Sequence, residues 1–156
     1  VDKYRWIDYG SSYLPSEMNA AYLYAQLEAC EKINQKRHQI YDTYHESLRD
    51  LEEQGKIQRP FVPEGCVHNA HMYYIKVIDI AVRTRLIAYL RENGIAPAFH
   101  YVPLHSSPAG EKFGRFHGKD VYTTKESERL LRLPMFYDLS MDDVDYIAEK
   151  IREFEF

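Results

Sequence analysis

The sequence predicts an α+β chain in which a long N-terminal helix is followed by a small few-stranded sheet covered by helices. Residues 16–54 contain no Gly or Pro, and their apolar side chains recur at three- and four-residue steps, as in a helix. Residues 72–77 are rich in aromatic and β-branched side chains, which favour a strand. Two further helical patterns, at 80–93 and 141–154, flank the remaining strand signals. Elements in this order are typical of helices layered on a small sheet.

The first predicted element runs from Pro15 to about Glu53 as one helix, either unbroken or bent once. Ser12 or Ser16 is placed to cap its start, and Gly55 to close its end. Such a helix would be roughly 55 Å long at about 1.5 Å per residue, whereas a compact chain of this size is about 40 Å across. Its first half is apolar around most of its circumference. We therefore expect this half to pack on a partner subunit, a missing domain, or both.

The later elements are bounded by Gly, Pro and helix-capping side chains. Strands are expected at Lys56–Arg59, Asn69–Val77 and Ile95–Tyr101. Helices are expected at Ile80–Asn93, at Thr124–Leu133 with Thr123 or Thr124 as cap, and at Met141–Phe154 with Ser140 as cap. The charged run 125–129 is expected to be an exposed helix face, and 105–116 a loop with one helical turn.

Composition excludes several classes of partner. The 156 residues suffice for one domain with a real core, and the net charge of −4 gives no electrostatic reason to expect nucleic acid. No apolar run approaches the length of a membrane span. Two cysteines without metal or redox spacing favour a reducing, cytoplasmic location over a disulfide. The chain begins at Val1 without Met, so we expect it to be a fragment of a longer protein.

The densest cluster of chemically capable side chains lies at residues 99–105. His100, Tyr101 and His105 follow a predicted strand, where binding groups are often placed, and they could position a polar substrate or move protons near neutral pH. The alternative is that these side chains simply pack. Cys66, His68 and His71 do not have the spacing of a known zinc site, so no metal is predicted. From the residues alone, the prediction stops at a polar-aromatic pocket on an oligomerising α+β domain.

Four segments, in order along nearly the whole chain, resemble the DegT/DnrJ/StrS family of sugar aminotransferases. They are residues 13–28 (YLPSEMNAAYLYAQLE), 69–76 (NAHMYYIK), 99–110 (FHYVPLHSSPAG) and 122–134 (YTTKESERLLRLP). The resemblance implies fold-type-I, pyridoxal-phosphate enzymes built from a large domain and a small C-terminal α+β domain. This chain is similar to the linking helix and the small domain only. It implies residues 1–14 as the connecting loop, 15–54 as the linking and dimerisation helix, and 55–156 as the small domain.

The resemblance also implies roles for particular residues. The Schiff-base lysine of the family would lie upstream of Val1, so the chain by itself is expected to be inactive and to hold no catalytic residue. Ser12 stands where relatives have an Asn that reaches the cofactor phosphate of the neighbouring subunit, which makes it the expected cofactor contact. Tyr13, His100, Tyr101 and His105 are the expected substrate contacts. The long helix is expected to form a homodimer.

The function implied is amination of C4 of a dTDP-4-keto-6-deoxyhexose, with glutamate as amino donor, for cell-surface polysaccharide synthesis. One alternative is the same chemistry at C3 or on a UDP- or GDP-sugar. Another is a free-standing, non-enzymatic dimerisation or binding module of the same fold.

Overall fold

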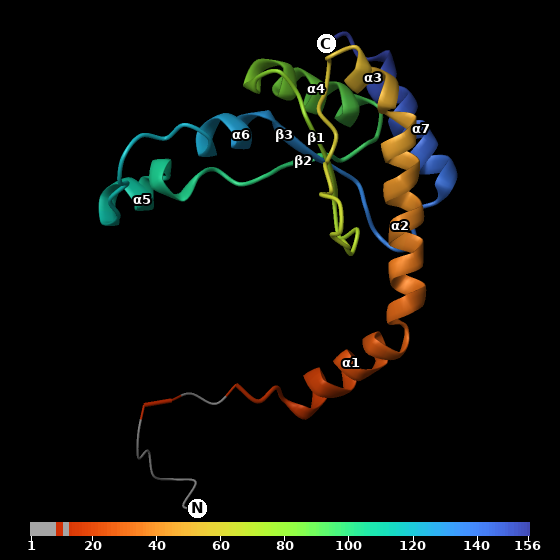
Figure 1. Cartoon of the computed structure of the whole chain (residues 1–156), viewed down its shortest axis with the longest axis vertical. Helices are drawn as coiled ribbons and strands as arrows, with labels where there is room; N and C mark the ends of the chain where they lie inside the picture. Colours follow the sequence, from red (N-terminus) through yellow and green to blue (C-terminus); the bar gives the residue numbers. More distant parts are fainter. Residues whose placement is uncertain (1–8, 11–12) are drawn as a thin grey trace, which may run out of the picture. The chain divides into compact units, whose positions relative to one another are not determined.

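The computed structural model describes residues 9–10 and 13–156, which fall into two compact units divided between Lys32 and Ile33 (Figure 1). The first unit contains helix α1 (Glu17–Glu28). The Ser16 hydroxyl accepts a hydrogen bond from the Asn19 amide at 3.3 Å, so Ser16 is the helix cap. The alternative cap, Ser12, lies outside the described residues.

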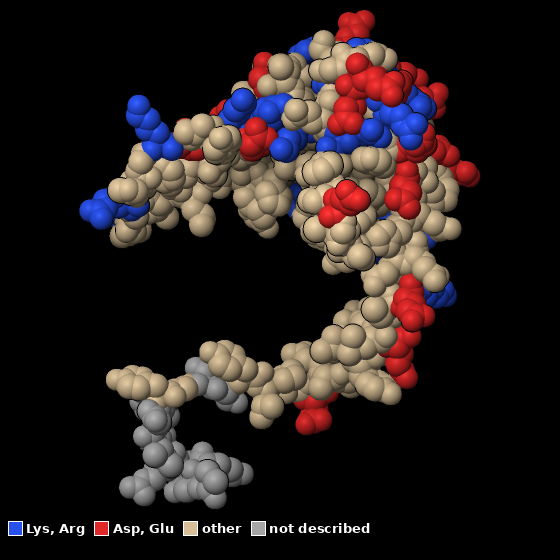
Figure 2. Space-filling model, viewed as in Figure 1, with Lys and Arg blue, Asp and Glu red and all other residues tan. Residues whose placement is uncertain are grey.

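Helix α1 buries none of its side chains. Its large apolar residues are among the most exposed of the described part of the chain: Met18, Tyr22, Leu23, Tyr24 and Leu27. Glu17 and Glu28 are its only charged residues, and Figure 2 shows that most of its visible surface is uncharged. An uncharged, apolar surface of this kind marks an interaction site.

The predicted single helix is divided into three segments, because α1 is followed by α2 (Cys30–Ser47) and α3 (Arg49–Glu53). The interruptions fall at Ala29 and Leu48. The Leu48 amide still donates a helical hydrogen bond to the Tyr44 carbonyl at 3.1 Å, so the interruption between α2 and α3 is slight. Neither position is Gly or Pro, which is why the sequence pattern did not reveal the breaks. Gly55, with φ of 72°, follows the end of α3 as predicted.

The second unit is built on an antiparallel sheet with strand order β1-β3-β2. Its strands are β1 (Tyr73–Lys76), β2 (Ala98–Phe99) and β3 (Leu130–Leu133). Strand β3 pairs on both sides, with Tyr73 opposite Leu133 and Phe99 opposite Leu131. Both predicted strands at 69–77 and 95–101 are present but shorter than expected. Of the strand predicted at 56–59, the structure has one isolated bridge between Gln58 and Lys76.

The prediction of a helix over 124–133 was wrong for its last four residues. Helix α6 (Thr123–Arg129) ends there, and Leu130–Leu133 form the central strand. Leu131 and Leu133 are buried, and pairing with two neighbouring strands outweighs the helical preference of a Leu-rich segment. The predicted threonine cap is also replaced: the Asp120 carboxylate accepts the amides of Thr123 at 2.9 Å and Thr124 at 3.1 Å.

Three helices cover one face of the sheet: α2, α4 (Ile80–Glu92) and α7 (Met141–Glu153). The core joins their apolar side chains to the buried face of the strands: Ile40, Tyr44, Leu86, Leu90, Val144, Ile147, Ile151, Tyr73, Ile75, Leu131 and Leu133. As predicted, α7 is capped by Ser140, and Gly94, with φ of 76°, follows the end of α4. Asp79 caps the start of α4.

The described contacts also fix the helix directions. The ammonium of Lys36 on α2 lies 3.6 Å from the sulfur of Met141, and Arg152 donates to the Ser47 carbonyl at 3.1 Å. The start of α2 thus contacts the start of α7, and the end of α2 contacts the end of α7. The two helices therefore run parallel, as Figure 1 shows. None of the helices among the described residues has the length and apolar character needed to cross a membrane.

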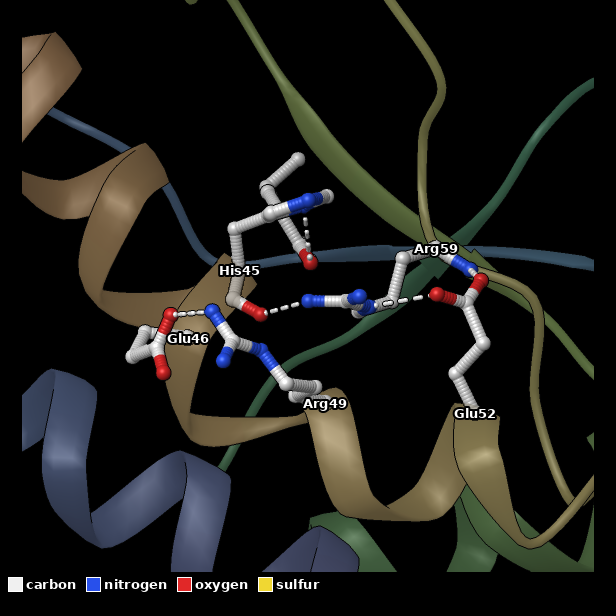
Figure 3. Close-up of polar contacts among 6 residues, drawn as sticks. His45, Glu46, Arg49, Glu52 and Arg59 are labelled. Atoms are coloured by element: carbon white, nitrogen blue, oxygen red, sulfur yellow. Dashed lines mark hydrogen bonds and ion pairs between the residues drawn. The ribbon is translucent and has the colours of Figure 1, made fainter.

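Arg59 fastens the chain after α3 to the end of α2 (Figure 3). Its amide and Nε donate to the two carboxylate oxygens of Glu52 at 2.7 and 2.8 Å, and its Nη1 donates to the His45 carbonyl. Partial burial opposes ionisation of Glu52, but these hydrogen bonds and the charge of Arg59 hold its pKa below the usual range. Burial, followed by the charge of Arg59, lowers the pKa of His45. The cluster therefore holds the chain between α3 and β1 against the end of α2.

Among the described residues of the second unit no helix covers the other face of the sheet, which carries Tyr74, Lys76, Arg132 and Ala98. Beyond β2 the chain continues through a 3₁₀ turn (Leu104–Ser106) and α5 (Pro108–Phe113). Gly110, within α5, is required where this helix packs against the 3₁₀ turn, because a Cβ atom there would lie 1.6 Å from the Leu104 carbonyl oxygen.

Candidate functional site

A hollow of about 620 Å³ opens on the uncovered face of the sheet. Its wall is made by Tyr74 and Lys76 of β1, by residues 100–104 after β2, and by Glu126 and Ser127 of α6. Its lining is mostly apolar or aromatic with a few convergent polar groups, which is the usual composition of a small-molecule site.

His100 and Tyr101 lie side by side in the wall of this hollow, with their rings edge to face and 5.3 Å between centroids. Nδ1 of His100 is buried and has no hydrogen-bond partner among the described residues. The Tyr101 side chain is 74% exposed, and no hydrogen bond occupies its hydroxyl within the described part of the chain. The exposed Tyr101 hydroxyl is therefore available to a bound molecule, whereas Nδ1 of His100 is enclosed by the protein.

A paired acid and base line the opposite side of the hollow. The Lys76 ammonium lies 2.7 Å from Glu126, which also pairs with Arg129 at 3.1 Å. The hydrogen bond from Lys76 is the largest influence on Glu126, and it keeps the pKa of that carboxyl below its usual range despite partial burial. Arg129 also donates to the Val77 carbonyl at 2.8 Å and to the Gln58 side chain at 3.0 Å. The network positions α6 against β1, and its single carboxylate, Glu126, is shared by the two cations Lys76 and Arg129.

Two further side chains hold the 100–101 segment in position. The Ser127 hydroxyl donates to the Tyr101 carbonyl at 2.7 Å, and Arg83 of α4 donates to the Ser127 carbonyl at 2.6 Å. The Arg83 guanidinium also stacks over the ring of Phe99, 5.5 Å from its centroid. Residues of α4 and α6 thus hold the end of β2, and His100 and Tyr101 that follow it, in position.

His105 lies outside the residues that line the hollow. Its Nε2 lies 2.9 Å from the Asp120 carboxylate, and its ring packs on Phe116 with 4.3 Å between centroids. Hydrogen bonds from the Thr124 side chain, then from the Thr124 and Thr123 amides and the nearby His105, hold the pKa of Asp120 below its usual value. In this arrangement His105 braces the loop before α6.

The remaining predicted residues are placed as follows. Tyr13 belongs to the first unit and is 90% exposed, whereas Ser12 lies outside the described residues. His68 packs on the rings of His38 and Tyr41, with centroids 4.8 and 4.5 Å away, and His71 bonds Asn69 at 2.9 Å. Within the described ranges, no cluster of three potential metal ligands occurs.

Sequence reasoning missed Lys76, Glu126 and Ser127 as parts of the hollow. The run 125–129 was expected to be an exposed face, but Glu126, Ser127 and Arg129 are half-buried against β1 and the 100–101 segment. The alternation of Tyr74 and Lys76 on one strand face could have placed Lys76 beside the site. No local pattern could have brought α6 to the same place.

The lysine that lines the hollow does not suit a Schiff base with pyridoxal phosphate. Schiff-base chemistry requires an amine that is not held as an ammonium, yet the lysine that lines the hollow, Lys76, is ion-paired with Glu126 at 2.7 Å. What the hollow does supply is a binding surface with the aromatic side chains of Tyr74 and Tyr101.

This arrangement of helices on a small antiparallel sheet is shared with about a third of the chain of fold-type-I aminotransferases. The profile of the DegT/DnrJ/EryC1/StrS aminotransferase family matches residues 1–152. The chain belongs to this family, whose members are pyridoxal-phosphate-dependent sugar aminotransferases.

Individual relatives agree with this assignment. A "Pleiotropic regulatory protein" of Geobacillus stearothermophilus is 32% identical over 143 residues, which are 88% of this chain and 36% of that protein. A DegT DnrJ EryC1 StrS aminotransferase from Brucella abortus is 30% identical with a TM-score of 0.72, covering 85% of this chain and 34% of that one. DesV of S. venezuelae, solved in complex with a ketimine intermediate, is 25% identical with a TM-score of 0.78. The match covers 88% of this chain and 36% of DesV. The chain thus spans about a third of the length of the proteins it matches.

Proposed function

We propose that this chain is the C-terminal part of a longer enzyme that transfers an amino group from glutamate to C4 of a dTDP-4-keto-6-deoxyhexose. The family assignment supports a sugar aminotransferase. The observation that carries the proposal to this chain is the exposed Tyr101 hydroxyl, which has no hydrogen bond within the described part of the chain, beside the His100 ring in a hollow of about 620 Å³. A sugar hydroxyl or carbonyl has the hydrogen-bonding groups that such a site lacks.

In this proposal the described residues bind and orient the substrate. The Tyr101 ring and the apolar wall pack against the sugar, while the Tyr101 hydroxyl and His100 fix its orientation by hydrogen bonds. Ser127 and Arg83 keep the two side chains in position. Pyridoxal phosphate, bound mainly by the remainder of the enzyme, would carry the amino group between donor and sugar.

We also propose that the enzyme is a homodimer in which the apolar surface of α1 packs on the second subunit. Exposed Tyr22, Leu23 and Leu27 provide the contact surface. Ser12 and Tyr13 precede this helix, and in this arrangement they reach the cofactor and substrate of the partner. His105 acts indirectly, by holding the loop before α6 in position. The reaction takes place in the cytoplasm and serves the synthesis of surface polysaccharide.

The test is the activity of the complete protein on dTDP-4-keto-6-deoxyglucose with glutamate, comparing wild type with Tyr101→Phe. Loss of the hydroxyl should raise KM or lower kcat by about tenfold, the value of one hydrogen bond to a polar ligand. Tyr137→Phe is the matched control, because Tyr137 lies outside the residues that line the hollow. Unchanged kinetics in Tyr101→Phe would remove Tyr101 from the site.

The same assay separates the alternatives. Preference for a UDP- or GDP-sugar, or amination at C3, would revise the substrate while keeping the reaction. Absence of any amination by the complete protein, together with an unaltered dimer, would favour the non-enzymatic dimerisation module.

A further inference from the structure

The loop that leads from Arg59 to β1 contacts α2 through the side chain of His68. The His68 ring lies against two rings of α2, with its centroid 4.8 Å from that of His38 and 4.5 Å from that of Tyr41. The contact with His38 is edge to face, with 74° between the ring planes. His68 is half-buried, whereas every other residue of 63–69 is exposed. The attachment of this part of the loop to α2 therefore depends on one imidazole.

Ala70, two residues further on, has a backbone conformation that residues other than glycine rarely adopt. Its φ is 48°, in the left-handed region, and its side chain is 2% exposed. A non-glycine residue keeps such a conformation only where its surroundings impose it. The backbone strain at Ala70 therefore favours release of the loop once His68 leaves α2.

The two imidazoles face each other without a counter-ion. Within the described ranges, neither His38 nor His68 forms a hydrogen bond or an ion pair. The titratable and charged groups around them come from α2, from β1 and from the chain before the loop: Tyr41, Asp42, His45, Tyr73, Tyr74 and Arg59. The loop itself adds Glu64 and His71, both of them exposed.

These surroundings accommodate one proton on the pair and oppose a second. Asp42 stands one helical turn after His38, and a charged imidazole is favourable against the Tyr41 ring, so a single cation is tolerated. A second proton would place two cations against each other with centroids 4.8 Å apart. Departure of His68 from α2 relieves that repulsion. Because the open loop takes up the second proton more readily than the closed loop, the open population rises as pH falls.

We propose that His38 and His68 form a pH-sensitive latch, closed while the pair carries at most one proton and open when both imidazoles are charged. Imidazoles ordinarily change charge between about pH 5 and pH 8, so the latch opens on the acid side of neutrality. Opening frees residues 60–72 from α2. Met72, the last residue of this loop, lines the larger hollow, so opening also alters the wall of that site. This last consequence rests on the proposed function, whereas the latch itself does not.

The test is hydrogen exchange of the complete protein, followed by mass spectrometry at about pH 7.5 and about pH 5.5. Protection factors, which correct for the intrinsic pH dependence of exchange, are compared for peptides that span residues 60–72. In wild type the protection should fall about tenfold at the lower pH, because repulsion between two charges at this separation is enough for such a shift.

His38→Phe is the decisive variant, because it keeps an aromatic ring against His68 and removes one of the two charges. Its protection over 60–72 should be the same at both pH values. His68→Phe removes the other charge with the same result, and it keeps the latch under test if His38→Phe fails to fold. His117→Phe is the matched control, since His117 is exposed in the loop before α6, and it should lose protection in acid as wild type does.

Equal protection of wild type at the two pH values overturns the proposal. So does an acid effect that survives in both His38→Phe and His68→Phe. If His45→Phe abolishes the effect while those two variants retain it, the titrating group is His45, whose Nδ1 lies 3.4 Å from the Tyr73 hydroxyl, and the latch is assigned wrongly.

The latch and the proposed function fail in different ways. Hydrogen exchange follows the loop and not the reaction, so it decides on the latch even if the complete protein has no aminotransferase activity. If the protein is active, acid should raise KM for the nucleotide sugar more in wild type than in His38→Phe. An equal rise in the two proteins overturns the link between the latch and the hollow.

Discussion

The hydroxyl of Ser127 on α6 donates a hydrogen bond to the carbonyl of Tyr101 over 2.7 Å, although the two residues are 26 positions apart. Through this contact α6 holds the 100–101 segment, which lines the larger hollow. Arg83 also holds this serine in position, because it donates a hydrogen bond to the Ser127 carbonyl at 2.6 Å. The shape of the hollow therefore depends on Arg83, which lies outside it, as well as on its own residues His100, Tyr101 and Ser127.

Replacing Ser127 with Ala should loosen the 100–101 segment. We expect a loss of about 1 kcal/mol in the free energy of unfolding and a rise of about fivefold in KM for the nucleotide sugar. Urea denaturation and steady-state kinetics measure the two effects. Thr84→Ala is the control, because its hydroxyl bonds only within its own helix, to the Ile80 carbonyl at 2.7 Å. A KM for Ser127→Ala equal to that of the control would show that the hydrogen bond from Ser127 to Tyr101 does not shape the site.

Removing the hydroxyl of Tyr44 should destabilise the core. That hydroxyl donates to the Pro134 carbonyl at 3.0 Å, and burial raises the pKa of Tyr44 well above its ordinary value. Tyr44→Phe leaves a half-buried acceptor unsatisfied and should cost about 1–3 kcal/mol in urea denaturation. Tyr41→Phe on the same helix removes a hydroxyl that has no hydrogen bond among the described residues, so it should cost less. Equal losses in the two variants would argue against the Pro134 contact.

Stability should fall in acid partly through Glu52. Its folded pKa is depressed by Arg59, so it contributes stability above its unfolded pKa and loses it as pH falls through the folded value. With an ordinary pKa of about 4.3, the loss should begin below about pH 5. Glu52→Gln should lower stability at pH 7 by about 1 kcal/mol, a modest figure because the carboxylate is partly exposed to screening solvent.

The measurement is urea denaturation from about pH 3 to pH 7. Glu52→Gln should flatten the curve in its acid part, whereas Glu53→Gln should preserve the wild-type profile, because Glu53 is exposed on the same helix. A wild-type curve that is level below pH 5, or one that Glu52→Gln leaves unchanged, contradicts the role assigned to Arg59.

Charging the apolar surface of α1 should weaken the proposed dimer. Leu23 and Leu27 are 54% and 62% exposed and stand one helical turn apart, so Leu23→Glu with Leu27→Glu places two carboxylates in the contact. We expect the complete protein to shift from dimer to monomer in analytical ultracentrifugation. Gln26→Glu adds charge to the same helix at a polar position and serves as the control. A double variant that sediments as wild type would exclude this surface from the interface.

Much of the second unit could be predicted from local pattern. The capping residue Ser140 and Gly94 lie where the sequence placed helix boundaries, because capping and left-handed turns depend on one or two residues. Strand β1 and the wall residues His100 and Tyr101 were also found, since aromatic and β-branched residues bounded by Pro and Gly mark a strand and its end. The breaks at Ala29 and Leu48 gave no such signal.

By itself, the sequence determined the α+β class, the family, and an N-terminal helix more apolar than a solvent-facing helix should be, because periodicity and residue type are local properties. Only the tertiary structure decided that Leu130–Leu133 is the central strand and that Ser127 and Glu126 complete the hollow. These outcomes depend on which strands pair and which face of the sheet stays open. Contacts between residues far apart in the chain decide both.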